Sequence, residues 1–182
     1  MGTRGVTEVI FENKTVVAQY GQWDHYPMGQ GITILNFLRD QDNIDKLWTN
    51  LNLHLTYEAS DEELKKIYAN YFNEDGMGTF EDGKRFGEDY PSLTRDTGGG
   101  ILEVIANATE PVPLVLDKDF KNDDLFCEGI YTINLDDETF TTEFHGETLT
   151  ITFERCLTIT DDEYLTEAKC GVYQYHKQEQ AV

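Results

Sequence analysis

The chain is poor in basic residues, in cysteine and in long apolar runs. It carries 14 Lys and Arg against 35 Asp and Glu, which gives a formal net charge of −21 over 182 residues. Because so acidic a surface repels phosphates and attracts basic protein surfaces, we expect no direct nucleic-acid binding. No apolar segment has the length of a membrane span or the form of a signal peptide, so we expect no membrane contact.

The three cysteines, Cys127, Cys156 and Cys170, are odd in number and lack the spacing of a zinc site. The simplest interpretation is a set of reduced thiols in a cytosolic protein. A Cys–His nucleophile pair would need one of them beside His145 or His176, and no local signature selects such a pair.

The acidic residues are concentrated in segments that also contain residues of a folded core. Residues 117–167 hold fifteen acids and three bases, and residues 58–90 hold ten acids and four bases. The chain is 39% hydrophobic and 12% aromatic, far above the content of a disordered acidic tail. The pattern therefore predicts a folded acidic surface.

Periodicity predicts strands at both ends of the chain and helices between them. Residues 129–135, 139–144 and 148–154 alternate with a period of two, which is typical of a three-stranded antiparallel meander. The other predicted elements are a hairpin (5–11 and 15–20), helices at 32–39 and 43–53, a helix opened by Ser60 and Glu63, a long surface loop (73–90), a short helix after Thr97, an edge strand or extended linker (111–117) and a final helix opened at Asp161.

This order predicts an α+β fold with an N-terminal β-hairpin, several helices and a C-terminal antiparallel β-meander. The length suits a single domain, 1–182, in which the hairpin and helices (1–110) and the acidic meander (111–182) are possible sub-lobes.

No motif identifies a reaction, so we expect no catalytic residue and no cofactor. Asp24 beside His25 could form an acid/base pair in a pocket, but adjacent side chains usually point apart, and a structural loop is the favoured interpretation. Residues 117–128 match part of a calcium-binding loop, but Lys121 places a cation at a ligand position. We therefore expect no metal site.

Seven acidic clusters with few interleaved cations exceed what solubility requires. Carboxylates spaced along a folded surface can imitate the phosphates of DNA and so bind a basic nucleic-acid channel. The predicted partner-binding residues are Asp123, Asp124, Asp136, Asp137, Glu138, Asp161, Asp162, Glu163, Glu81, Asp82, Glu88 and Asp89.

A recognisable motif occupies the N-terminal third. Its marks are Gly2-Thr3-Arg4-Gly5, the run from Gln19 through Gln22, Trp23 and Asp24, then Tyr26-Pro27, Gly29-Gln30-Gly31 and a second patch that contains Arg95 and Asp96. It resembles a family of small proteins of phages and mobile elements. Within such phage-borne proteins, the length, acidity and motifs are similar to type II-A anti-CRISPR proteins.

The resemblance implies a non-enzymatic inhibitor that binds Cas9 or the Cas9–guide RNA complex, with a homodimer as one option, in the bacterial host cytoplasm. It implies no catalytic residues. Two alternatives stay open. One is a small hydrolase or ligand-binding protein, in which the 19–31 loop and the 93–98 patch form a pocket around Trp23, Asp24 and Arg95. The other is a structural or regulatory phage protein whose acidity serves only solubility.

Overall fold

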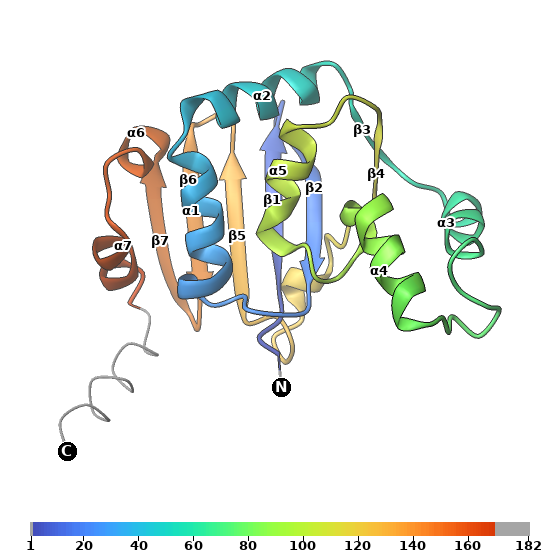
Figure 1. Cartoon of the computed structure of the whole chain (residues 1–182). Helices are drawn as coiled ribbons and strands as arrows, with labels where there is room; N and C mark the ends of the chain where they lie inside the picture. Colours follow the sequence, from blue (N-terminus) through green and yellow to red (C-terminus); the bar gives the residue numbers. More distant parts are fainter. Residues whose placement is uncertain (1, 170–182) are drawn as a thin grey trace.

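The computed structural model describes residues 2–169 and confirms the predicted α+β class. Its main sheet has five strands in the order β2-β1-β5-β6-β7 (Figure 1). The N-terminal hairpin and the C-terminal meander are both present, and they are joined edge to edge. Their strands are β1 (Gly5–Phe11), β2 (Lys14–Gly21), β5 (Gly129–Asn134), β6 (Thr139–Phe144) and β7 (Glu147–Thr152).

The joint between hairpin and meander is a parallel pairing of β1 with β5, whereas the other strand pairs of the main sheet are antiparallel. Val9 lies opposite Ile133, and both side chains are fully buried. The two possible sub-lobes, 1–110 and 111–182, therefore share one sheet and one hydrophobic core.

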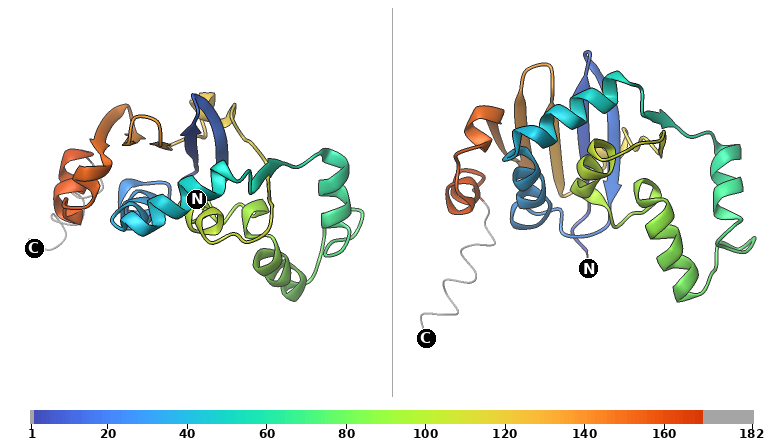
Figure 2. Two further views of the ribbon diagram at one scale, coloured as in Figure 1. Left: turned by 90° about the horizontal axis from the view of Figure 1, so that it is seen from above. Right: turned by 45° about the horizontal axis from the view of Figure 1, so that its top comes forward.

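Helices cover one face of this sheet. Three of the helices that pack on it are α1 (Ile32–Leu38), α2 (Gln41–Asn52) and α5 (Ile101–Ala106), and the view from above shows the helices and the sheet as two layers (Figure 2). Their buried side chains meet the inward residues of the strands in the main core. The predicted helices at 32–39 and 43–53 and the short helix after Thr97 are confirmed.

The opposite face is covered over β1 and β2 by the segment that leads into β5. This segment contains the short helical turn η4 (Phe120–Asn122). Lys121 contacts both carboxylate oxygens of the buried Glu8 at 3.1 Å, and Phe120 packs edge-on against Tyr20. Over the meander, the same face carries the aligned outward-facing residues Thr132, Thr141 and Thr150.

A second, smaller unit lies beyond β2 (Figure 1). It contains α3 (Asp61–Tyr68) and α4 (Phe80–Asp89), and it joins the rest of the chain through β3 (Thr56–Glu58), which pairs in parallel with β4 (Val112–Leu114). The helix predicted after Ser60 is confirmed, and the extended segment predicted at 111–117 forms β4.

The prediction of a surface loop over residues 73–90 is wrong, because α4 occupies most of this segment. Gly83 and Gly87 lower its helix propensity. A reciprocal capping box nevertheless starts the helix: Asp82 accepts from the Thr79 amide at 2.9 Å, and Thr79 accepts from the Asp82 amide at 3.2 Å.

The meander ends two residues earlier than the alternation predicts. Thr152 caps α6 (Phe153–Cys156), which turns the chain out of the sheet. The predicted final helix is confirmed as α7 (Asp161–Glu167). Among residues 2–169, no helix is long and apolar enough to cross a membrane.

Candidate functional site

The two motif patches of the sequence lie against each other beside the end of β2. The side-chain amide of Gln19 donates to the carbonyl oxygen of Thr94 at 3.0 Å. The indole nitrogen of Trp23 donates to the carboxylate of Asp96 at 3.0 Å. These contacts join residues more than seventy positions apart in the chain.

The backbone joins the same two patches. The amide of Gln22 donates to the carbonyl oxygen of Arg95 at 2.8 Å. The side-chain oxygen of Gln30 accepts from the amide of Gly99 at 2.7 Å. This contact of Gln30 was not predicted from the sequence, and the position of Gln30 inside the motif is the one sequence feature that could have indicated it. Most polar groups of the motif are therefore satisfied within the fold.

His25 fills the space that the motif glycines leave. Its side chain is fully buried, and a Cβ at Gly21 would lie 1.9 Å from its ring carbon Cε1. A Cβ at Gly5 would lie 2.5 Å from its Cδ2 and 2.0 Å from the carbonyl oxygen of Gly129. These two glycines are required because the ring and the neighbouring strand leave no room for a side chain.

Burial lowers the pKa of His25 from 6.5 to about 4, against the smaller opposing effects of the Trp23 carbonyl and the Asp24 charge. The ring is therefore neutral at pH 7. Nδ1 lies 3.0 Å from the carbonyl oxygen of Trp23, so Nδ1 carries the proton and donates. Nε2 has no hydrogen-bond partner among the described residues.

Asp24 and His25 do not form an acid/base pair. The Asp24 side chain is exposed and accepts from the Tyr26 hydroxyl at 3.2 Å, while the His25 ring points into the fold. A small cavity of about 170 Å³ lies nearby and is lined by Gln19 and Arg95, but by neither Trp23 nor Asp24. The geometry therefore gives the motif a structural role.

The thiols and carboxylates of the described residues offer little reactive chemistry. Burial raises the pKa of Cys127 to about 11 and that of Cys156 to about 12, which leaves both as weakly reactive thiols. Cys170 and His176 lie outside the described residues. Within residues 2–169, no group of three or more His, Cys, Asp and Glu side chains is arranged to hold a metal ion.

Several predicted partner-binding carboxylates instead hold the fold together. Asp136 accepts from the amides of Glu12 and Asn13 at 2.9 and 2.7 Å. These two residues form the turn between β1 and β2 and have left-handed φ angles of 51° and 58°. Asp136 thus fixes the hairpin turn from the first turn of the meander.

Two further predicted residues are helix caps. Glu163 accepts from the amide of Thr160 at 2.9 Å and closes the start of α7, as Asp82 closes the start of α4 with Thr79. These hydrogen bonds hold the pKa of both carboxyls below their ordinary values. Both groups therefore stay ionised and contribute to helix stability at neutral pH.

Other predicted carboxylates also make contacts within the fold. Asp161 forms an ion pair with Arg39 at 2.7 Å, and Asp89 accepts from the hydroxyl of Tyr71 at 2.6 Å. Asp137 accepts from Asn134, Glu88 pairs with Lys84, and Asp123 accepts from two amides of its own turn. Asp162 also has an interaction partner within the described chain.

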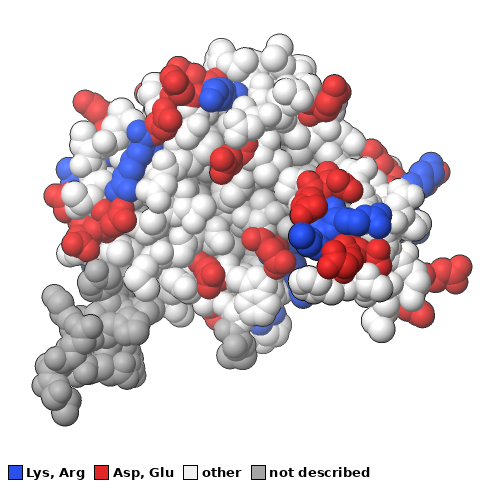
Figure 3. Space-filling model, in the orientation of Figure 1, with Lys and Arg blue, Asp and Glu red and all other residues white. Residues whose placement is uncertain are grey.

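Three predicted partner-binding carboxylates, Glu81, Asp124 and Glu138, are exposed and make no hydrogen bond or ion pair within the described chain. On the face shown in Figure 3, acidic side chains lie in separate groups, and Lys and Arg side chains lie among them over α4. The clusters therefore do not merge into one uninterrupted acidic patch on this face.

Comparison of the chain with protein-family models, with curated proteins and with solved structures finds no match.

Proposed function

We propose that this protein is a non-enzymatic inhibitor of a bacterial CRISPR nuclease, Cas9, in the host cytoplasm. It binds the basic nucleic-acid-binding surface of Cas9 or of the Cas9–guide RNA complex and blocks DNA binding or cleavage. The observation that carries the proposal is the formal net charge of −21, from 35 acidic and 14 basic residues, on a chain whose described residues form a packed core. A fold that presents carboxylates on capped helices and closed turns loses little conformational entropy on binding.

The alternative of a ligand pocket between the two motif patches has less support. Its three key side chains do not line one cavity, and the hydrogen bonds that join the patches are internal to the fold. The exposed predicted carboxylates that make no contact within the described chain lie elsewhere, at Glu81, Asp124 and Glu138.

The test is capture of the protein by immobilised Cas9–guide RNA at low and high salt, with and without competing DNA. We expect capture that weakens with salt and is abolished by DNA, because charge-complementary surfaces associate in a salt-dependent way. Capture that DNA leaves unaffected would indicate inhibition away from the DNA channel. Absence of capture would contradict the proposal.

The variant for this test combines Glu81→Lys, Asp124→Lys and Glu138→Lys, since these exposed side chains make no hydrogen bond or ion pair within the described chain. Asp136 is left intact, because its reversal would remove the contact that closes the hairpin turn. The Glu81→Lys/Asp124→Lys/Glu138→Lys variant should be captured more weakly than the wild type, while its far-ultraviolet circular dichroism spectrum stays unchanged.

The control combines Asp42→Lys, Glu103→Lys and Glu110→Lys, which are exposed acids outside the predicted clusters. Each set makes three Asp/Glu-to-Lys reversals, so the net charge changes equally in both. Only the first set should weaken capture. Equal weakening by both sets would show that net charge alone acts, without a defined surface.

A further inference from the structure

The α3–α4 unit, residues 61–90, is built around its own aromatic cluster. Phe86 is 7% exposed, and its ring centroid lies 5.4, 5.4 and 5.3 Å from those of Tyr68, Tyr71 and Phe72. None of these residues belongs to the main core. The unit therefore projects beyond the sheet with packing of its own.

The loop between the two helices and the start of α4 expose two large apolar side chains. Met77 is 70% exposed and Phe80 is 86% exposed. Their backbone is ordered, because the Asn73 side chain accepts from the amides of Asp75 and Met77 at 3.1 and 2.8 Å. The Thr79 capping box then makes Phe80 the first residue of α4. Both side chains are thus held out on a defined backbone.

A recess lies beside this loop. It has a volume of about 970 Å³ and is lined by Lys65, Tyr68, Ala69, Phe72, Asn73, Glu74 and Gly76. The backbone of Gly78 packs against Phe72, one of the residues that line the recess, since a Cβ at Gly78 would lie 2.8 Å from the Phe72 ring. The loop therefore combines protruding apolar side chains with an apolar hollow, the two halves of an interlocking protein contact.

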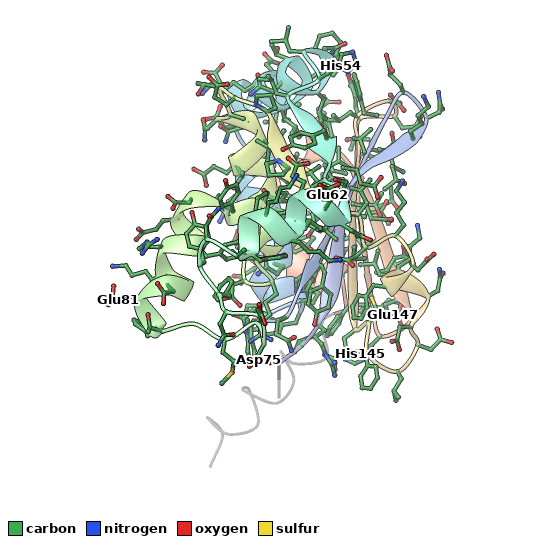
Figure 4. The ribbon with its side chains drawn as sticks, turned by 90° about the vertical axis from the view of Figure 1, so that its right-hand side faces the viewer. His54, Glu62, Asp75, Glu81, His145 and Glu147 are labelled. Carbon is green, nitrogen blue, oxygen red and sulfur yellow. The ribbon has the colours of Figure 1, made fainter. Side chains whose placement is uncertain are left out.

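Unpaired carboxylates surround the apolar residues. Glu74, Asp75 and Glu81 are exposed and make no side-chain hydrogen bond or ion pair among the described residues. Asp75 and Glu81 lie at the loop and at the start of α4, whereas Glu147 lies on the other side of the view (Figure 4). Three of the four cations of residues 58–90 are already paired with acids of the same unit: Lys66 with Glu62, Lys84 with Glu88 and Arg85 with Asp82.

We propose that residues 73–81, the tip of the α3–α4 unit, form the docking surface for a basic protein surface that contains an apolar pocket. An apolar centre inside a charged rim is the usual anatomy of such an interface, and the acidic rim selects a basic partner. The same rim opposes a second copy of this chain and opposes nucleic acid. The inference rests on the proposed function and gives it a binding face.

The test measures the affinity for Cas9–guide RNA of the double variant Met77→Ser/Phe80→Ser. We expect a loss of about tenfold or more, because large apolar side chains at the centre of an interface carry most of its binding energy. The matched control is Leu53→Ser, an exposed leucine (63%) at the end of α2 outside the tip. It should bind within about twofold of the wild type.

A second variant, Glu74→Gln/Asp75→Asn/Glu81→Gln, keeps the shape of the tip and removes its charge. It should bind with a weaker dependence on salt than the wild type. Urea unfolding of each variant should match the wild type, since the substituted side chains are exposed.

The outcomes separate the two proposals. A wild-type protein that does not bind overturns the proposed function and this docking surface with it. A wild type that binds, with a Met77→Ser/Phe80→Ser variant that binds equally well, overturns only the docking surface. Sedimentation of the free proteins adds one further outcome. If the wild type is a dimer and the double variant is a monomer, the tip binds a second copy of this chain, and the proposal of a basic partner is overturned.

Discussion

Acid should destabilise this protein well above the pH at which ordinary carboxylates titrate, because of His25. Its pKa falls from 6.5 to about 4 on folding, so the unfolded chain binds a proton at pH values where the folded chain does not. Stability is therefore complete above about pH 6.5 and is lost as the pH falls toward 4. The 2.5-unit difference corresponds to about 2 kcal/mol lost at pH 5 and about 3 kcal/mol at pH 4.

The assay is urea unfolding at pH 7.5 and pH 5 at constant ionic strength, for the wild type and for His25→Asn. Asparagine keeps a nitrogen that can donate to the Trp23 carbonyl, but it does not titrate. The variant should be less stable than the wild type at pH 7.5, since the smaller side chain leaves a void. The wild type should lose about 2 kcal/mol more than the variant between the two pH values. Equal losses would refute a buried neutral ring.

Substitutions at Gly21, Gly5 and Asp136 test how the motif glycines and the first acid of the β5–β6 turn stabilise the fold. Gly21→Ala should cost about 1–3 kcal/mol of stability, and His25→Ala should recover part of that cost, because the three nearest atoms to the new Cβ all belong to the His25 ring. His25→Ala should not restore the stability lost in Gly5→Ala, since the new Cβ at Gly5 also meets the carbonyl oxygen of Gly129. If the stability losses of Gly21→Ala and His25→Ala simply add in the double variant, the packing of the ring against Gly21 is contradicted. Asp136→Ala should lower the free energy of unfolding by about 2 kcal/mol through the loss of two amide contacts in the turn 12–13. Asp136→Asn, which keeps one carbonyl oxygen, should cost about half as much, and thermal melts that show no change for Asp136→Ala would argue against the contact.

Local pattern predicts the elements of this fold better than it predicts their assembly. The alternation of 129–144 and the helix start at Ser60 depend on neighbouring residues, and both predictions hold. The capping box expected at Ser60 is only half formed, because the Ser60 side chain accepts from the Glu63 amide while the Glu63 carboxylate accepts from the Tyr57 hydroxyl. The parallel pairing of β1 with β5 joins segments about 120 residues apart, and neither strand carries a local signal for it. α4 was not predicted because Gly83 and Gly87 lower the helix propensity of the segment, although the sequence does contain the capping box at Thr79.

The candidate site shows the same division. That the motif patches meet could be expected from the motif, but that His25 occupies the space of its glycines depends on the path of the chain. A count of acids cannot separate a carboxylate such as Asp136, which closes a turn 124 residues away, from an unpaired one such as Glu138. Nor does the sequence distinguish Phe80, which is exposed, from Phe86, which is buried.

The position of the apolar residues bears on whether the acidity serves solubility alone. Carboxylates that cap helices, such as Asp82 and Glu163, stabilise the fold, whereas unpaired ones add to the repulsion within a chain of charge −21. If the unpaired acids served solubility alone, their surroundings would be expected to be polar. Instead, Glu81 directly follows Phe80, which at 86% is the most exposed large hydrophobic residue of the described chain. An exposed apolar side chain lowers solubility and strengthens binding, so its place among unpaired carboxylates favours a partner surface.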